Sequence, residues 1–350
     1  MRMRIGINGF GRIGRAIARI NLERDVFDLV AVNDINPDIG NVAYLLKYDS
    51  TYGRLARDVR VEGPDTLAVE RAPSIRVSRH HEIDAVPWKA DAVDLVIDAS
   101  GIEHNLPALR RLADQGVRHC VVTNAPDEQF VDRFVIFGVN ETDIRRGDFV
   151  LSASICDAAA FAPVALLLER HFGIEYGSLT TLHPWLSYQR LLDGPSFSFS
   201  DPGSIHSAYA LGRASTLSLI PKTTSCLRAS AKVLPGIDRK FVSLSYRVPT
   251  TIVSSADLTV KLSRDASRDD VIGVFEAAER TQAYPVIANN YQALVSVDFA
   301  GVEHSAVVDH RWTMVHGDAQ LKLVLWYDNE WGYGSRVVDI VSRLARLDAE

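Results

Sequence analysis

The sequence predicts an α/β protein in which a doubly wound parallel sheet is followed by a second, α+β domain with a mixed or antiparallel sheet. Three observations predict this fold class. The 350 residues exceed the size that one hydrophobic core usually supports. Strand-like and helix-like segments alternate over about the first 150 residues, which is typical of parallel sheets. Strand-like segments then follow one another with fewer helices between them, so we expect the domain boundary near Ser154–Cys156.

The elements of the first domain are predicted from apolar runs and helical periodicity. Arg4–Ile7 is a predicted strand that ends in a glycine turn, and Arg15–Leu22 is the helix after it. A second helix is predicted over Leu106–Gln115. The remaining predicted strands are Leu29–Val32, Leu95–Asp98, His119–Thr123 and Phe134–Phe137.

The second domain begins with a long amphipathic segment, Ala158–Phe172, which predicts a helix. Further helices are predicted at Arg268–Ala278 and Val337–Leu347. The polar stretch Ser196–Ala208, which contains Gly and Pro, predicts a long loop. The predicted strands are Gly177–His183, Phe241–Val248, Asp257–Leu262, Leu294–Phe299 and Leu321–Leu325.

Charge and composition exclude several classes of partner. The chain has 38 basic and 44 acidic residues and no basic block, so neither a nucleic acid nor an anionic membrane is expected to bind. The longest apolar stretch, near Phe161–Leu168, is too short to cross a bilayer, and Met1–Arg4 carries no signal-peptide pattern. We therefore expect a cytoplasmic protein. Cys120, Cys156 and Cys226 form no CxxC pair, so neither a disulfide framework nor a metal site is predicted.

A glycine-rich turn follows the first predicted strand. Gly9 permits the tight turn, Gly11 lets a pyrophosphate approach the main chain, and Gly14 allows the helix to pack closely on the strand. Asp34 ends the second predicted strand, 20 residues after Gly14, where a carboxylate can bind ribose hydroxyls and repel a 2′-phosphate. The pattern indicates a dinucleotide-binding (Rossmann) domain that prefers NAD to NADP.

A cysteine and a histidine are candidates for covalent catalysis. Cys156 directly precedes the long predicted helix, whose dipole favours the nucleophilic thiolate, although the carboxylate of Asp157 opposes this effect. His183 ends an apolar run that would deliver it to the edge of a sheet. The alternatives are a buried structural thiol at a domain junction and a surface or core histidine. Cysteine–histidine pairs are nonetheless a recurring nucleophile arrangement.

The chain resembles the glyceraldehyde-3-phosphate dehydrogenase family along nearly its whole length. The residues that carry the resemblance are Ile7–Arg15, Val32–Asp34, Tyr48–Arg54, Lys232–Pro235, Arg247–Thr250 and Trp326–Tyr333. The resemblance implies an NAD-binding domain over residues 1–155, a catalytic domain over 156–322, and a C-terminal strand and helix over 323–350 that return to the first domain. It also implies a homotetramer, and a mechanism in which a cysteine thiolate attacks an aldehyde, hydride passes to the nicotinamide, and phosphate attacks the resulting thioester.

The resemblance implies roles for individual residues. Cys156 is the implied nucleophile and His183 its base, while Asn329 orients the nicotinamide carboxamide. The implied substrate-binding residues are Arg247, Thr224, Ser225 and Asp157, and the implied NAD-binding residues are Gly9, Gly11, Arg12, Ile13, Gly14 and Asp34.

Several residues depart from the family's pattern at its phosphate sites. Ile155 and Asp157 flank the cysteine where the family has hydroxyls, and Asp157 would repel a phosphate dianion. Leu186, Tyr188 and Leu211 replace polar or charged residues. These departures predict an aldehyde other than glyceraldehyde 3-phosphate, with the acyl acceptor left open. The alternatives are the phosphorylating glycolytic enzyme and a non-catalytic NAD-binding regulatory protein.

Overall fold

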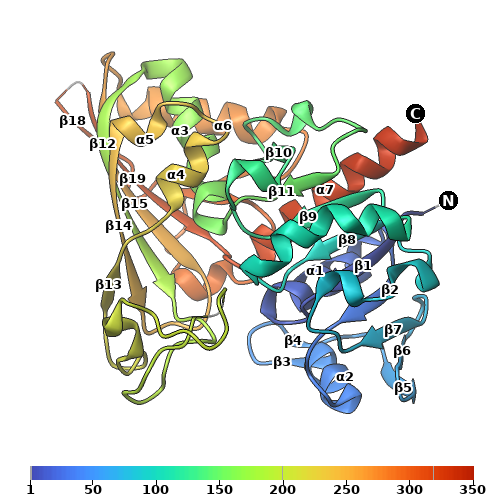
Figure 1. The fold of residues 1–350 in the computed structure, drawn as a ribbon. Coiled ribbons are helices and arrows are strands. Elements are labelled where there is room, and N and C mark those ends of the chain that lie inside the picture. Colours follow the sequence, from blue (N-terminus) through green and yellow to red (C-terminus); the bar gives the residue numbers. More distant parts are fainter. Residues whose placement is uncertain (1, 199, 318) are drawn as a thin grey trace.

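The computed structural model describes residues 2–198, 200–317 and 319–350. It contains two large β-sheets, one in each half of the chain, and helices pack against both (Figure 1). The predicted α/β class and its two sheets of different type are confirmed. None of the described helices is both long and apolar enough to cross a membrane.

The first sheet has nine strands in the order β10-β11-β9-β8-β1-β2-β7-β6-β5. The pairs from β10 to β7 are parallel, whereas β7, β6 and β5 form an antiparallel extension at one edge. The strands are β1 (Arg4–Asn8), β2 (Asp28–Asn33), β5 (Val59–Gly63), β6 (Thr66–Val69), β7 (Ile75–Ser78), β8 (Leu95–Asp98), β9 (His119–Val122), β10 (Arg133–Phe134) and β11 (Val150–Ser152). The extension was not predicted from the sequence.

Helix α1 (Arg12–Arg24) follows β1, and α2 (Ile39–Lys47) leads into the short β3–β4 hairpin (Tyr48–Asp49 and Gly53–Arg54). The helix predicted over Leu106–Gln115 is a 3₁₀ helix, Glu103–Gln115, and it contains Pro107, whose missing N–H disfavours α-helical hydrogen bonding. Four shorter 3₁₀ helices lie at Ile83–Ala85, Trp88–Asp91, Glu128–Phe130 and Glu141–Asp143.

The second sheet is mixed, with the strand order β13-β14-β12-β15-β19-β17-β16, and β18 also pairs with β19. β12 runs parallel to β14 and antiparallel to β15. The strands are β12 (Ile174–Pro184), β13 (Ile220–Lys222), β14 (Phe241–Val248), β15 (Ser254–Leu262), β16 (Ile287–Asn290), β17 (Ala306–Asp309), β18 (Met314–His316) and β19 (Gln320–Tyr327).

Four helices accompany this sheet: α3 (Cys156–Phe172), α4 (Cys226–Ala231), α5 (Ile237–Lys240) and α6 (Arg268–Thr281). α3 packs on the inner face of the sheet, where the rings of Phe161 and Phe241 meet edge to face at 5.1 Å. Alternate residues of β12 and β14 are buried beneath it, including Thr181, His183 and Arg247. This alternation is typical of a sheet that is covered on one face.

Two predicted strands differ in the structure. The strand predicted at Leu294–Phe299 is instead an irregular segment followed by a 3₁₀ helix, Ser296–Phe299, in which Asp298 bonds back to the N–H of Val295 as a helix cap does. The strand predicted at Phe134–Phe137 pairs only as far as Phe134. The predicted loop at Ser196–Ala208 is irregular apart from one bridge between Phe197 and Ile205, and its Phe199 lies outside the described residues.

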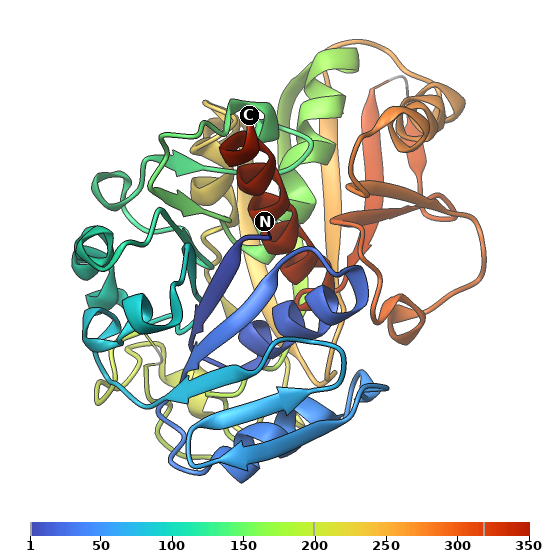
Figure 2. The same cartoon turned by 90° about the vertical axis from the view of Figure 1, so that its right-hand side faces the viewer.

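The last two elements connect the two halves of the chain. β19 pairs with β15 and β17 in the second sheet, and α7 (Trp331–Ala349) then packs against α1 of the first half (Figure 2). Gly334 allows the two helices to approach closely, because a Cβ there would lie 3.0 Å from the end of the Ile20 side chain, which would have to shift. The C-terminal helix therefore returns to the first half, whereas the strand before it belongs to the second sheet.

Candidate active site

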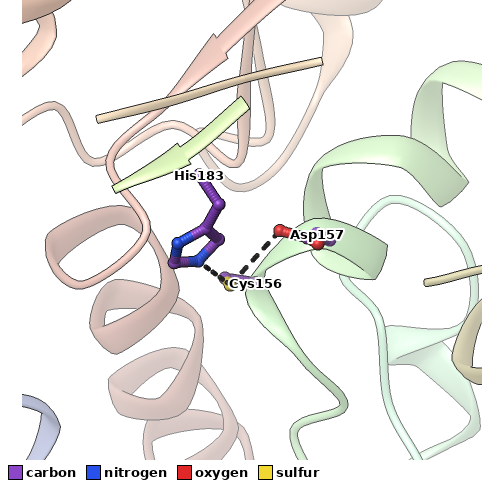
Figure 3. A group of neighbouring side chains, drawn as sticks. All are labelled: Cys156, Asp157 and His183. Atoms are coloured by element: carbon purple, nitrogen blue, oxygen red, sulfur yellow. Dashed lines mark hydrogen bonds between the residues drawn. The ribbon is translucent and has the colours of Figure 1, made fainter. Parts of the chain in front are cut away.

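Cys156 and His183 come together at the junction of the two halves (Figure 3). Cys156 is the first residue of α3, and His183 lies near the end of β12. The Cys156 Sγ and His183 Nε2 atoms are 3.7 Å apart, a hydrogen-bond distance for sulfur. The structure thus brings together two residues that are 27 positions apart in the sequence. Their roles as nucleophile and base stay predictions.

A strained turn presents Cys156 at the start of its helix. Ser154, between β11 and α3, is buried and has a φ of 59°, a left-handed conformation that non-glycine residues rarely adopt. The Tyr333 hydroxyl donates to the Ser154 carbonyl at 3.0 Å and holds the turn from α7. The C-terminal helix thus fixes the position of the cysteine, as well as the packing of the two halves.

The hydrogen bonds of His183 define its tautomer. Its Nδ1 lies 2.8 Å from the carbonyl oxygen of Pro184, which can only accept a hydrogen bond. Nδ1 therefore carries the proton in the neutral ring, and Nε2 has a free lone pair directed at the thiol of Cys156. This is the tautomer that a general base requires.

Asp157 lies beside the thiol and is held by two hydroxyl groups. Its Oδ1 is 3.6 Å from the Cys156 Sγ and accepts a hydrogen bond from the Tyr327 hydroxyl at 2.9 Å. Its Oδ2 accepts from the Thr224 hydroxyl at 3.3 Å. Because the side chain is buried and fixed by these donors, its negative charge acts on Cys156 from a constant position.

Burial and neighbouring charges favour a neutral thiol and a neutral imidazole. Burial, and next the carboxylate of Asp157, raise the pKa of the Cys156 thiol well above its usual value. Burial, and next the guanidinium of Arg247, lower the pKa of His183 to about 4. The lowering of the thiol pKa expected from the helix dipole is therefore outweighed, and the neutral His183 Nε2 lies where it can accept the thiol proton.

Asp157 should tune the reactivity of the thiol. Because its negative charge disfavours the thiolate, Asp157→Asn removes a cause of the raised pKa, and we expect the rise of Cys156 alkylation with pH to move to lower pH. The rate of iodoacetamide labelling from pH 6 to 10 measures the shift. The control is Asp269→Asn, which changes an exposed carboxylate on α6. A midpoint that stays in place or moves to higher pH would contradict the assignment.

The other predicted substrate-binding residues lie at different depths. Arg247 is only 8% exposed, and its Nε has no hydrogen-bond partner within the described residues. Thr224 is bound to Asp157, whereas Ser225 is exposed at the start of α4. The nearby Arg213 pairs with Asp193 at the surface. Arg247 is thus the predicted residue best placed to bind an anion.

The glycine turn has the geometry that a dinucleotide requires. Gly9 has a φ of 86°, and a Cβ at Gly14 would lie 2.2 Å from the Gly9 carbonyl oxygen, so both positions exclude other residues. Gly11 opens onto free space, with nothing within 4 Å of where its Cβ would be. A pyrophosphate can therefore approach the main chain at the N-terminus of α1.

Two further features fit NAD. Asp34 lines a cavity of about 210 Å³ together with Gly11 and Asn36, and its carboxylate accepts from the N–H groups of Phe10 at 2.6 Å and Asn36 at 2.8 Å. Asn329 is buried at the end of β19, and its Oδ1 has no hydrogen-bond partner within the described residues. An unsatisfied buried amide oxygen suits a ligand carboxamide, which donates an N–H.

Arg12 forms ion pairs that the sequence did not predict. Its guanidinium pairs with Asp49 and, at 3.0 Å, with Glu330, and the Tyr52 hydroxyl donates to Asp328 at 2.9 Å. The network joins the glycine turn of the first domain to the loop before α7. Because the Arg12 guanidinium is engaged in this network, residues 12 and 13 would contact NAD through their main-chain N–H groups at the start of α1. The roles of Arg12 and Ile13 in NAD binding stay predictions.

We expect Asp34 to select the cofactor. Asp34→Ala removes the acceptor for the ribose hydroxyls and the charge that repels a 2′-phosphate, so the Kd of NAD should rise about tenfold and the preference over NADP should fall. Fluorescence titration with each dinucleotide measures both effects. The control is Asp38→Asn, an exposed residue at the start of α2. An unaltered preference would show that another residue distinguishes the two dinucleotides.

The three side chains of the site also have metal-ligating atoms. Those of Cys156, Asp157 and His183 lie within 4.8 Å of one another. The sequence predicts no metal here, and this stays a prediction. A soft divalent ion bound to the thiolate would block the nucleophile, so metal binding and the covalent chemistry exclude each other.

Comparisons with known proteins decide the family. The model of the glyceraldehyde 3-phosphate dehydrogenase C-terminal domain matches residues 155–329, and that of the NAD binding domain of the same family matches residues 3–106. The chain belongs to the glyceraldehyde-3-phosphate dehydrogenase family. These matches show that NAD is its cofactor and that it is an oxidoreductase.

Curated relatives match the chain from end to end. A glyceraldehyde-3-phosphate dehydrogenase of Eremothecium gossypii is 35% identical over 98% of this chain and 99% of its own length. Glyceraldehyde-3-phosphate dehydrogenase 3 of Kluyveromyces marxianus is 37% identical over the same shares. A protein of Gracilaria gracilis named as the cytosolic enzyme is 35% identical over 98% of each chain.

The expectation of a different aldehyde is wrong. Relatives that match over the whole chain are named glyceraldehyde-3-phosphate dehydrogenase, which favours the glycolytic alternative. The expectation rests on Leu186, Tyr188 and Leu211, which replace polar or charged residues of the family. The structure has a buried guanidinium at Arg247 whose Nε has no partner among the described residues, so the site retains a charge that a phosphate group can bind.

Two residues of the site were not predicted as functional. Tyr327 positions Asp157, and Tyr333 holds the turn before Cys156. Both lie in Trp326–Tyr333, a segment that carries the family resemblance, so the motif contained the signal. Their hydroxyl contacts span 170 and 179 residues and could not be found from sequence spacing.

Proposed function

We propose that the protein is an NAD-dependent glyceraldehyde-3-phosphate dehydrogenase that oxidises the aldehyde through a thioester on Cys156. The observation that carries the proposal is the 3.7 Å contact between the Cys156 Sγ and the unprotonated Nε2 of His183, beside an NAD-binding domain. The names of the full-length relatives support the substrate.

The site residues can perform the chemistry in sequence. As the Cys156 sulfur attacks the aldehyde carbon, His183 Nε2 accepts the thiol proton and passes it to the carbonyl oxygen, giving a hemithioacetal. His183 Nε2, unprotonated again, then accepts the hydroxyl proton as the C–H bond breaks and its electron pair leaves as hydride. Bound NAD would supply the acceptor for this hydride. Phosphate then attacks the thioester carbon, and the Cys156 thiolate leaves.

Two buried groups orient the reactants in this proposal. The guanidinium of Arg247 binds the phosphate group of the substrate, since it is buried without a carboxylate partner. The Asn329 Oδ1 would accept a hydrogen bond from the carboxamide of NAD, since it is buried without a partner among the described residues. Both contacts satisfy polar groups that otherwise lack partners.

The proposal is tested by the rate of NADH formation from purified protein, NAD and D-glyceraldehyde 3-phosphate, with and without inorganic phosphate. Rapid turnover that requires phosphate supports the proposed function. The alternative is a non-catalytic NAD-binding protein, which would bind NAD and form no NADH. A slow rate that is indifferent to phosphate would contradict phosphorolysis of the thioester.

We also propose that the protein is a cytoplasmic homotetramer. The outer face of the second sheet carries exposed apolar side chains from neighbouring strands: Tyr176 and Leu182 on β12, and Val242 and Leu244 on β14. Figure 1 shows the helices of this domain on the other face of the sheet. Exposed apolar side chains on neighbouring strands are typical of a contact between subunits. Sedimentation equilibrium gives the number of chains.

A further inference from the structure

Lys222 lies on the same face of the second sheet as the catalytic histidine. It is the last residue of β13 and pairs with Ser245 of β14, which pairs in turn with Thr181 of β12. Arg247 and His183 occupy the next positions that point the same way on β14 and β12, and they pair with each other. Directly paired residues and alternate residues share one face of a sheet. The Lys222 side chain therefore projects to the inner face, toward Cys156.

Lys222 and Arg247 are cations without an anionic partner. Neither has a carboxylate oxygen within 4.0 Å among the described residues. Within the part of the chain that the structure describes, the Lys222 ammonium donates only to the neighbouring Thr223 carbonyl, and the Arg247 Nε is buried with no acceptor. Buried guanidinium groups are normally paired, so an unpaired one beside a second cation indicates space reserved for an anionic ligand.

The charges of the site show that these groups are close enough to act together. Burial and the charge of Arg247 lower the pKa of Lys222, while Asp157 and Cys156 act in the opposite direction. Lys222 in turn contributes to the lowered pKa of His183. Two cations thus face one carboxylate, since Cys156 and His183 are neutral at rest. The site carries an excess positive charge before a substrate binds.

We propose that Lys222 is a phosphate-binding residue of the active site and that it forms, with Arg247, a two-cation site for a phosphate group of the reaction. An ammonium and a guanidinium are the side chains that bind phosphate most strongly. Leu186 and Leu211 stand where the family has polar or charged residues that bind phosphate. Lys222 on β13 supplies a positive charge in their place. This inference rests on the proposed function, because the phosphate belongs either to the aldehyde or to the attacking inorganic phosphate.

The test compares three variants of the full-length enzyme. Lys222→Met removes the charge and keeps the length, Lys222→Arg keeps the charge, and Lys89→Met is the control at an exposed lysine of the first domain. We define the specificity ratio as kcat/KM for D-glyceraldehyde 3-phosphate divided by kcat/KM for D-glyceraldehyde. For Lys222→Met we expect either this ratio to fall about 10- to 100-fold or the KM of inorganic phosphate to rise by that factor. Lys222→Arg should recover most of the loss, and Lys89→Met should match the wild type.

The two kinetic measurements, the specificity ratio and the KM of inorganic phosphate, identify the source of the phosphate. A fall in the specificity ratio alone assigns the site to the aldehyde's phosphate, and a rise in the KM of inorganic phosphate alone assigns it to the acceptor. If Lys222→Met leaves both quantities within twofold, or if Lys222→Arg fails to recover either, the inference is overturned.

A measurement without turnover separates this inference from the proposed function. Inorganic phosphate should protect Cys156 of the wild-type protein from iodoacetamide, and about tenfold more phosphate should be needed for Lys222→Met. If the wild type oxidises no glyceraldehyde 3-phosphate, the proposed function fails, and protection still decides the role of Lys222. Equal protection of the wild type and Lys222→Met would overturn the inference.

Discussion

Cys156→Ser is expected to lower kcat for NADH formation by about 10⁴-fold or more, because a serine hydroxyl with a neutral imidazole at its side is a far weaker nucleophile than a thiolate. The Kd of NAD should stay within about twofold, since the glycine turn, Asp34 and the Asn329 Oδ1 are unchanged. Steady-state rates and fluorescence titration with NAD measure the two quantities.

The control for Cys156→Ser is Cys120→Ala. Cys120 is fully buried in β9 of the first sheet, and its thiol donates to the Leu109 carbonyl, whereas the thiol of Cys156 faces a histidine that can accept its proton. This variant should keep kcat, and it should still incorporate one iodoacetamide label at Cys156. Appreciable turnover of Cys156→Ser would show that the reaction does not pass through this thiol.

The parts of the molecule that the sequence predicted well are those whose signal is local. β8 matches its predicted bounds because a continuous apolar run marks a buried strand, and β14 also matches its predicted bounds. The glycine turn is specified by residues within six positions, and its conformation follows from steric limits on each glycine. The strands β5–β7 of the antiparallel extension have only four or five residues each, so the alternation in β6 and β7 covers too few positions to predict a strand.

The chemistry of the site was harder to predict because it depends on register between distant strands. Leu186 and Leu211 could be identified as lost phosphate contacts from their places along the chain. Whether a cation replaces them depends on which face Lys222 occupies, and that follows only from the pairing of β13 with β14. Counting lost contacts position by position therefore led to the wrong substrate.

The C-terminal segment shows why motifs far apart in the sequence belong together. Glu330 binds Arg12 of the glycine turn, Tyr327 binds Asp157, and Tyr333 binds the Ser154 carbonyl. One short segment thus holds both the NAD-binding turn and the nucleophile. Since positioning errors of about 1 Å can cost 10²-fold in rate, we expect this segment to influence the proposed reaction through the position of Cys156.

His183→Asn is expected to lower kcat by about 10²- to 10⁴-fold, the usual contribution of a positioned general base. Asparagine can still donate a hydrogen bond to the Pro184 carbonyl, so the strand end should be retained. The pKa of His183 is lowered to about 4, which means that its Nε2 is unprotonated and able to act as a base above that pH. In the wild type, the rate of proton removal from Cys156 should therefore not depend on the hydroxide concentration at neutral pH.

Without His183, the thiol proton must pass to solvent. Because the pKa of the Cys156 thiol is raised, the thiolate fraction in His183→Asn should increase about tenfold for each pH unit between 7 and 9. The pH dependence of the NADH burst in a stopped-flow experiment measures this change, and His171→Asn at an exposed position of α3 is the control. A burst rate for His183→Asn that equals the wild type and has the same pH profile would mean that Asp157, the other acceptor within reach of the thiol, takes the proton instead.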